Sequence, residues 1–417
     1  MFQRISKKFQ HSLQVVQNNT VFRAIRKGLV MTIPTLMIGS FVLVLLNLPI
    51  PVFQDFLNGF LSGALRTILL FIYNGTFDLL SIIILLTISY SYAELKTTHL
   101  SSIITIPILS LGSFCIMSGF GTDAFVSTSF GVVGMFTAIL TAIVSSSLFI
   151  KLRELRIFSD SKTYADGSDH DFNTVVAHVI PGCIVLFLFA TANYILVNIF
   201  HLSSLPQLFS NLLVQFFKNM DATLFTGILY VTFVGLFWFF GIHGGNVLDE
   251  VAKQLFVGGV AANATAVAAG KAPTEILSKT FFDNFVFMDG AGATICLIIA
   301  ILLFAKRKNI RNLAQLGIIP TIFNVNEFIL FGTPVVYSPI FFLPFVLVPI
   351  VFTITSFLAF SLGLVPLITN DSINWTTPVF FSGYLTTGSI WGALLQLVNI
   401  VIGVLIYRPF IRLYERR

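Results

Sequence analysis

Runs of apolar residues long enough to cross a lipid bilayer recur along almost the whole of this chain of 417 residues. A helix that crosses the hydrocarbon core needs about 20 predominantly apolar residues. Charged residues make up only 10% of the chain, whereas soluble domains carry about 25%. We therefore predict an all-α integral membrane protein and exclude a soluble fold. The clearest apolar windows cover residues 28–48, 79–92, 100–120, 131–150, 179–200, 224–240, 293–305, 339–362 and 388–407.

The positions of the positive charges predict how the chain is oriented. Short loops rich in Lys and Arg stay in the cytoplasm. Basic residues gather in four places, at 4–27, 151–156, 306–311 and 408–417. Both termini are therefore predicted to be cytoplasmic, with eight to ten spans and an even count. The net charge of +6 reflects this distribution, and no nucleic-acid partner is expected.

Composition divides the chain into five parts. Residues 1–21 are polar and basic and lack the apolar core of a cleavable signal peptide. They form either an interfacial amphipathic helix or a frayed tail. Two transmembrane halves follow, at 22–200 and 221–412, and residues 413–417 are a cytoplasmic tail. The halves are joined at 201–220 by an amphipathic linker helix, predicted to lie along the membrane surface.

The longest polar segment, residues 156–173, contains Asp169, His170 and Asp171. These side chains can bind a metal ion, but the Gly, Ser and Asp residues around them also describe an ordinary solvated loop. We favour the loop and predict no metal site and no cofactor. The three cysteines lie inside apolar runs and lack CxxC spacing, so they are interpreted as packing residues.

Two apolar segments of the second half are interrupted by helix-breaking residues. The first extends from about residue 243 to 292 and is rich in Gly and Ala; the second, residues 316–339, contains several prolines. Broken backbone at membrane depth is tolerated only where it is buried in protein or lines a cavity. Interrupted segments of this kind also mark the binding sites of many transporters. We therefore predict two re-entrant hairpins.

Glu327 is a carboxylate inside an apolar run, where a charge costs about 3 kcal/mol to insert. Such a residue usually faces a cavity and has a functional role. Asn324 lies three residues before it and shares its face if the segment is helical, and Asn326 adds a neighbouring amide. Carboxylates and amides together suit the hydroxyl groups of a sugar. The alternative is a structural cap or a pairing with another helix.

Four further residues are candidates for substrate binding. His243, within GIHGG, opens the first interrupted segment, and its glycine neighbours let the backbone approach a ligand closely. The alternative for it is a purely structural histidine. Trp238 and Trp375 suit either a membrane-interface belt or a platform for a sugar ring. Asp289 either caps the following helix or lines the cavity. No catalytic residue is assigned, because HExxH, GxSxG and paired-Asp patterns are absent from the span centres.

These motifs resemble those of enzyme IIC, the membrane-embedded sugar permease of the bacterial phosphotransferase system. Within this family, the motifs resemble those of the lactose/cellobiose/diacetylchitobiose branch. The resemblance covers about residues 22–412. The motifs that carry it are AIRKGLVMTIPTLMIGSFVLVLLNLP, WFFGIHGGNV, FFDNFVFMDGAGAT, KRKNIRNLAQLGIIP, FNVNEFILFGTPVVYSP, WTTPVFFSGYLTTGSIWGALLQ and IYRPFIRLYE.

The resemblance implies about ten transmembrane helices with two re-entrant hairpins, a homodimer formed by the first half and a sugar site in the second. It implies translocation of a sugar, a β-linked disaccharide, across the bacterial plasma membrane by an elevator-type motion. Partner enzymes IIB and IIA would supply the phosphoryl group, because this chain has no residue suited to carrying one. By motif match, His243 and Glu327 contact the sugar, and Trp238 and Trp375 occupy the positions of ring-stacking aromatics.

Three departures from the family pattern lie near the expected site. Phe328 stands where the family usually has proline, Ser338 where it usually has asparagine, and MDGAGAT replaces a GGSG-like segment. They imply an unusual substrate or a loss of efficient transport. Two alternatives therefore stay open. One is a divergent membrane sensor that binds sugar without coupled transport. The other is an ion-coupled transporter, which would predict more buried carboxylates than Glu327 and Asp289.

Overall fold

The computed structural model describes residues 19–123, 125–155, 176–202, 205–333, 335–336 and 338–415. Over these residues the regular structure is helical, apart from an isolated bridge between Met288 and Gly290. Among them, seven helices, or up to eight if one bent pair forms a single span, are long and apolar enough to cross a membrane. The predicted all-α membrane fold is confirmed, whereas ten spans and two re-entrant hairpins stay predictions. The N-terminal segment 1–18 and the polar segment 156–173 lie outside the described residues.

The chain forms two compact units. The first comprises Met1–Pro34 and Thr76–Asn211, and the second comprises Thr35–Gly75 and Leu212–Arg417. The segment Thr35–Gly75 therefore packs with the C-terminal unit rather than with its neighbours in sequence. The assignment of scaffold and sugar-binding roles to 22–200 and 221–412 stays a prediction, because compactness does not test function.

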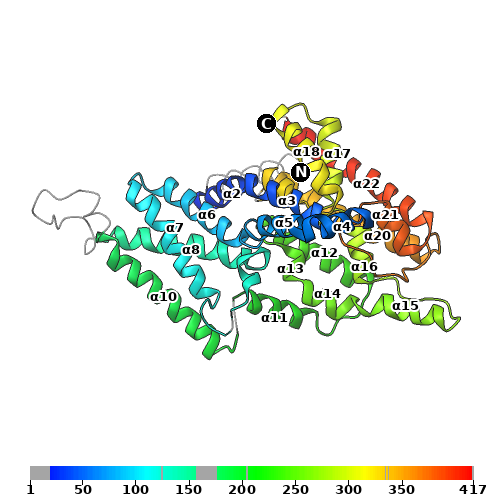
Figure 1. Cartoon of the computed structure of the whole chain (residues 1–417), viewed down its shortest axis with the longest axis horizontal. Helices are drawn as coiled ribbons and strands as arrows, with labels where there is room; N and C mark the ends of the chain where they lie inside the picture. Colours follow the sequence, from blue (N-terminus) through cyan, green and yellow to red (C-terminus); the bar gives the residue numbers. More distant parts are fainter. Residues whose placement is uncertain are drawn as a thin grey trace, which may run out of the picture. The chain divides into compact units, whose positions relative to one another are not determined.

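Five long helices make up most of the described part of the first unit (Figure 1). α6 packs against α2, α7 and α8, and α10 packs against α7 and α8. The close approach of α2 to α6 requires Gly28, because a Cβ atom there would lie 2.7 Å from the Cα atom of Ile88. The bounds are α2 (Thr20–Met31), α6 (Leu80–Lys96), α7 (Leu100–Met117), η2 (Ser127–Phe130), η3 (Val132–Gly134), α8 (Met135–Arg153) and α10 (Val179–Asn198).

The second unit is built on α12 (Leu224–Phe239), α17 (Thr294–Phe304), α20 (Pro339–Ser361) and α22 (Ile390–Glu415). α22 packs against α17 and α20, and α20 packs against α12. Shorter elements surround them: α4 (Pro51–Gly59), η1 (Phe60–Gly63), α5 (Ala64–Asn74), α13 (Gly244–Val247), α14 (Asp249–Phe256), α15 (Gly258–Ala268), α16 (Lys279–Phe281), the π-helix η5 (Phe282–Val286), α18 (Lys308–Ile322), α19 (Glu327–Gly332) and α21 (Phe381–Thr387).

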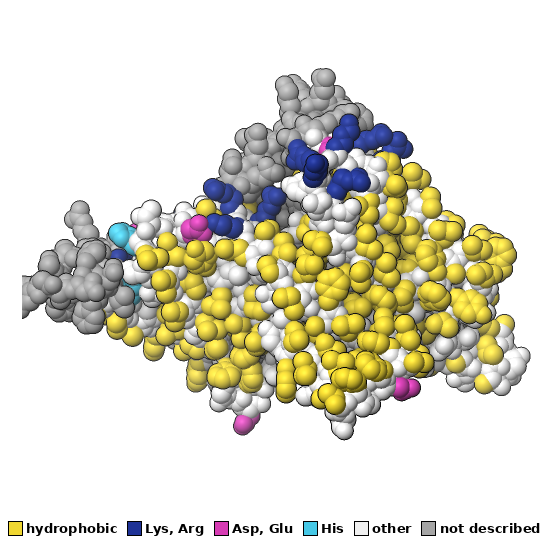
Figure 2. All heavy atoms as spheres, turned by 45° about the horizontal axis from the view of Figure 1, so that its top comes forward, with side chains coloured by type: hydrophobic (Ala, Val, Ile, Leu, Met, Phe, Trp, Pro, Cys, Tyr) yellow, Lys and Arg dark blue, Asp and Glu magenta, His cyan; other side chains and the backbone are white. Residues whose placement is uncertain are grey.

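Two helices cross the boundaries between the units. They are α3 (Ile33–Asn47) and α11 (Leu205–Phe217), and α11 lies within the predicted linker at 201–220. The predicted position of α11 along the membrane surface stays a prediction. Hydrophobic side chains cover most of the face seen in Figure 2, as is required when the surrounding solvent is lipid rather than water.

Helices of the second unit are interrupted at both predicted places. α12 ends at Phe239, and the chain then passes through Gly241, whose φ of +77° is readily adopted only by glycine. Between α18 and α19, Asn324 takes a φ of +67°, a left-handed conformation that Asn tolerates better than most residues. The irregular backbone therefore coincides with the GIHGG and FNVNE motifs.

The buried amide of Gln396 on α22 holds several of these irregular segments together. Its Oε1 accepts from the backbone N–H groups of Phe380 (2.7 Å) and Gly383 (3.1 Å). Its Nε2 donates to the carbonyl oxygen of Asn284 (2.6 Å) and to the hydroxyl of Ser382 (3.0 Å). All four bonds of the amide are therefore made in an apolar environment, where polar groups without partners are costly.

Replacing Gln396 with Leu is expected to destabilise the protein by about 2 kcal/mol, since each of four bonds between membrane-embedded groups contributes about 0.6 kcal/mol. Thermal unfolding of the purified chain in detergent measures the change. Gln215→Leu, at an exposed position of α11, is the matched control and should leave the midpoint nearly unchanged. Equal midpoints for the two variants would show that the Gln396 bonds do not stabilise the fold.

Candidate functional site

The GIHGG turn after α12 determines the position of His243. Gly244 allows the turn to pack on α12, because a Cβ atom there would lie 2.8 Å from the Cα atom of Val234. His243 then caps α13, and its Nδ1 accepts a hydrogen bond of 3.1 Å from the backbone N–H of Asn246. In a neutral imidazole the ring proton must therefore lie on Nε2, which makes that atom a donor.

Glu327 lies opposite that donor. Its Oε1 is 3.9 Å from His243 Nε2, which is longer than a hydrogen bond. Its Oε2 is buried and has no hydrogen-bond partner in the described part of the chain. A buried carboxylate oxygen without a partner is costly. The pair therefore presents an N–H donor next to a carboxylate acceptor, and the two groups do not hydrogen-bond to each other.

Trp238 in the last turn of α12 supports the histidine ring. The two ring centroids are 4.7 Å apart, with the planes inclined by 52°, and Phe331 packs on the indole from 6.2 Å. Trp238 is only 1% exposed, so its face is covered by protein. Its Nε1 has no acceptor among the described residues. The structure thus brings Trp238, His243 and Glu327 together, and Trp238 contributes an indole N–H rather than an open ring face.

The two predicted residues Asn326 and Asp289 hold the MDGAGAT loop in place. Asn326 Nδ2 donates to the carbonyl oxygen of Ala291 (3.1 Å) and to the hydroxyl of Thr294 (2.8 Å). Asp289 Oδ2 accepts from the backbone N–H of Ile295 and so caps α17, which was one of its two predicted roles. Its Oδ1 has no partner within the described residues. The amide donors of Asn326 are therefore used by the protein itself.

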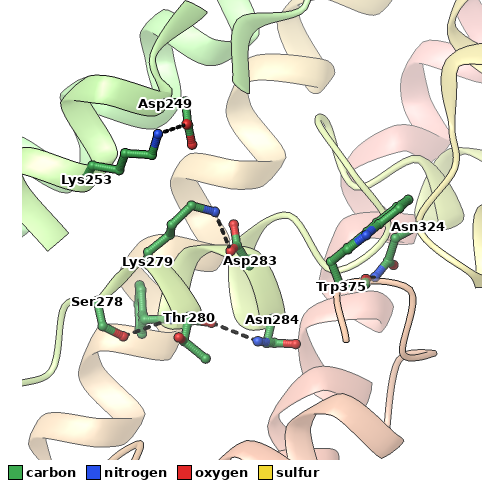
Figure 3. A network of polar contacts seen from close by, with 10 residues as sticks. Asp249, Lys253, Ser278, Lys279, Thr280, Asp283, Asn284, Asn324 and Trp375 are labelled. Atoms are coloured by element: carbon green, nitrogen blue, oxygen red, sulfur yellow. Dashed lines mark hydrogen bonds and ion pairs between the residues drawn. The ribbon is translucent and has the colours of Figure 1, made fainter. Parts of the chain in front are cut away.

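Asn324 and Trp375 form a second pair, shown in Figure 3. Asn324 Nδ2 donates to the carbonyl oxygen of Trp375 and, at 3.5 Å, to that of Thr377. This bond joins the turn before α19 to the segment that carries Trp375. The indole of Trp375 is exposed, with 51% of its surface accessible, which an aromatic platform requires. Asn324 Oδ1 is buried and has no partner in the described part of the chain.

Figure 3 also shows ion pairs that neutralise nearby carboxylates. Lys253 lies 2.8 Å from Asp249 and 3.0 Å from Glu250, and Lys279 lies 2.8 Å from Asp283. These carboxylates have their own cations, whereas in the described part of the chain the group within ion-pair distance of Glu327 is His243. Glu327 Oε2 and Asp289 Oδ1 are therefore the buried carboxylate oxygens of the described residues that have no hydrogen-bond partner, and of these two groups only Glu327 lies beside His243.

Comparison with known proteins places the chain in a family. A family model described as "Phosphotransferase system, EIIC" matches residues 26–349. The chain belongs to this family. Among curated relatives of this EIIC chain, the lichenan permease IIC component of Bacillus subtilis (strain 168) is 30% identical, with 95% of this chain and 89% of the relative covered. The cellobiose-specific EIIC component of Geobacillus stearothermophilus is 29% identical, with 95% and 90% covered.

A solved structure is also similar to the EIIC chain. It is the crystal structure of the transporter ChbC, the IIC component from the N,N′-diacetylchitobiose-specific phosphotransferase system. The TM-score is 0.52 at 30% sequence identity, with 99% of this chain and 97% of that chain covered. The similarity therefore extends over both units and supports the membrane permease fold.

Sequence reasoning did not identify the residues that hold the EIIC site together. Tyr407 on α22 donates 2.7 Å to the carbonyl oxygen of Gly292, and Thr294 accepts from Asn326. Gln396 was also overlooked, although an amide inside an apolar window is a visible signal. Tyr407 and Thr294 give no such signal, because both residue types are common in membrane helices.

Proposed function

We propose that this EIIC chain binds a sugar between His243 and Glu327 and translocates it for phosphorylation by a separate enzyme IIB. The observation that carries the proposal is the pair itself. A sugar hydroxyl both donates and accepts, so one hydroxyl can accept from His243 Nε2 and donate to the Glu327 carboxylate. His243 Nε2 and Glu327 Oε1 are 3.9 Å apart, which is too far for a hydrogen bond between them, so both remain available to the sugar.

The names of the relatives support a β-linked sugar. Relatives that share 28–30% of the sequence are named for lichenan, cellobiose and oligo-beta-mannosides. The similar solved structure is named for N,N′-diacetylchitobiose. These are β-linked saccharides, so we propose a β-linked disaccharide as the substrate class. The exposed indole of Trp375 offers a flat surface of the kind on which a pyranose ring packs.

The departures at Phe328 and the MDGAGAT loop are compatible with transport. Phe328 is buried in α19, which begins at Glu327, so the helix that presents the carboxylate forms without the usual proline. Gly290 and Gly292 have φ values of +97° and +79°, so the loop keeps the conformation that glycine permits. Both departures leave His243 and Glu327, the two groups of the proposed site, in place.

In the proposed cycle, the half at 221–412 carries the sugar by an elevator-type motion against a homodimeric scaffold formed by 22–200. Both termini lie in the cytoplasm, where enzyme IIB and enzyme IIA act. The role of His243 and Glu327 is to bind and orient hydroxyl groups, and the phosphoryl group comes from enzyme IIB.

Transport is tested in proteoliposomes that contain the purified chain, with enzyme IIB, enzyme IIA and a phosphoryl donor inside. We expect a labelled β-linked disaccharide to accumulate as its phosphate, and we expect no accumulation when enzyme IIB is omitted. Sugar binding without accumulation dependent on enzyme IIB would instead identify the chain as a membrane receptor.

Replacing Trp375 with Ala is expected to weaken disaccharide binding by about 2- to 12-fold, because an aromatic packing contact contributes about 0.5–1.5 kcal/mol. Titration calorimetry on the purified chain measures this change. Trp391→Ala is the matched control, since that indole is also exposed, at 58%, but belongs to α22. If both variants bound the sugar as the parent chain does, Trp375 would not be a platform.

A further inference from the structure

One face of α22 is exposed and apolar over more than three turns and ends at two arginines. Its exposed residues are spaced alternately by three and four positions, so they lie along one line of the helix. Leu405, the last apolar one, is 55% exposed, and the arginines Arg408 and Arg412 follow at the next two positions of the same line. The members of this line, here called the α22 stripe, are Leu394, Val398, Val401, Leu405, Arg408 and Arg412.

Arg408 and Arg412 form no ion pair in the described part of the chain. Glu415 lies three residues after Arg412 on α22, and its Oε1 accepts from the backbone N–H of Arg307 (3.3 Å). The guanidinium of Arg408 lies 5.1 Å from the centroid of the Phe304 ring, a cation–π contact that holds the group in place. Its Nε donor has no acceptor among the described residues. Two neighbouring cations of this kind favour an anion, and guanidinium suits phosphate in particular.

An open surface cavity lies at the arginine end of the α22 stripe. Its volume is about 630 Å³, and its described lining, all of it on α22, is Leu405, Arg408, Pro409, Phe410, Arg412 and Leu413. The lining thus combines two cationic side chains with four apolar ones. Figure 2 shows Lys and Arg side chains grouped at the edge of a broad hydrophobic surface. A ligand with a phosphate at one end and an apolar chain at the other matches this arrangement.

The length of the apolar part of the stripe is close to that of one lipid leaflet. From Leu394 to Leu405 the helix advances about 17 Å at 1.5 Å per residue, and half of a hydrocarbon core about 30 Å thick is about 15 Å. We propose that the α22 stripe and the adjoining cavity bind an anionic phospholipid. Its phosphate lies between Arg408 and Arg412, and an acyl chain lies along the apolar residues. A soluble acidic protein could pair with the two arginines, but it would not account for the exposed apolar residues of the α22 stripe.

Native mass spectrometry of the full chain in an uncharged detergent tests the site, with phosphatidylglycerol as the probe. Arg408→Gln/Arg412→Gln should lower its affinity about 30-fold, since each basic residue near an anionic lipid contributes about fivefold. The matched control Lys306→Gln/Lys308→Gln removes the same charge from exposed positions outside the stripe. It should change the affinity less than about threefold, because such charges act through screened water.

The Arg408→Lys/Arg412→Lys variant keeps both charges and should retain most of the binding, which separates loss of charge from misfolding. Phosphatidylcholine should bind more weakly than phosphatidylglycerol, and glycerol phosphate, which lacks acyl chains, should not displace the lipid. Equal losses of lipid affinity in Arg408→Gln/Arg412→Gln and in Lys306→Gln/Lys308→Gln would overturn the proposal. So would equal binding of the two lipids, displacement by glycerol phosphate, or displacement of the lipid by an acidic protein partner.

Discussion

Replacing Glu327 with Gln is expected to lower disaccharide affinity by about 10- to 150-fold, which corresponds to the loss of a hydrogen bond to a charged group, about 1.5–3 kcal/mol. The substitution keeps the volume of the side chain but exchanges a two-oxygen acceptor for an amide. Glu327 Oε2 is buried and has no partner among the described residues, so a ligand hydroxyl there would make its full contribution. Titration calorimetry on purified protein measures the effect.

The matched control for that experiment is Glu250→Gln. Glu250 pairs with Lys253 on α14, and its side chain is 60% exposed. Glu250→Gln removes the same charge from the same unit without changing a residue of the proposed site, so the sugar affinity should not change. A Glu327→Gln variant that bound the disaccharide as tightly as the control would remove Glu327 from the site.

Replacing Gly292 with Ala is expected to destabilise the protein by about 2–5 kcal/mol, because a positive φ and a steric overlap act together. Gly292 has a φ of +79°, and a Cβ atom there would lie within 2.7 Å of the Phe345 ring. Its carbonyl oxygen also accepts from Tyr407, so a shift of the loop would strain that bond. The thermal unfolding midpoint in detergent should fall markedly.

Two glycine variants separate the causes of that loss. Gly270 has a φ of +70°, and no atom lies within 4 Å of the position that a Cβ atom would take there. Gly270→Ala therefore carries only the backbone cost of about 1–2 kcal/mol. Gly258 begins α15 in open space without a positive φ, so Gly258→Ala should be neutral or slightly stabilising. If Gly292→Ala lost no more stability than Gly270→Ala, the contact with Phe345 would be unimportant.

The main features of the fold could be predicted from the sequence because they depend on local patterns. Apolar windows predict membrane helices, and the glycines of GIHGG and the prolines around Glu327 predict where those helices break. Glu327 was identifiable because a carboxylate in an apolar run is costly wherever the chain folds. The number of spans was harder to predict, because α12 and α17 have only 16 and 11 residues, fewer than the roughly 20 that a span needs.

Long-range pairing was not predictable, because it leaves no local pattern. The carbonyl oxygen of Asn47 accepts from the side chains of Asn374 and Thr376, more than 300 residues away in the sequence. Contacts of this kind place Thr35–Gly75 in the second unit. The partners of Asn326 were hidden for the same reason. An amide beside Glu327 looks the same in the sequence whether it binds a sugar or holds a loop.

A structure of the purified chain with its disaccharide bound is the most direct test of the sugar site. The sugar should lie with one hydroxyl within hydrogen-bond distance of both His243 Nε2 and the Glu327 carboxylate, and with a ring near Trp375. A well-ordered sugar that contacts neither His243 nor Glu327 would contradict the proposed site.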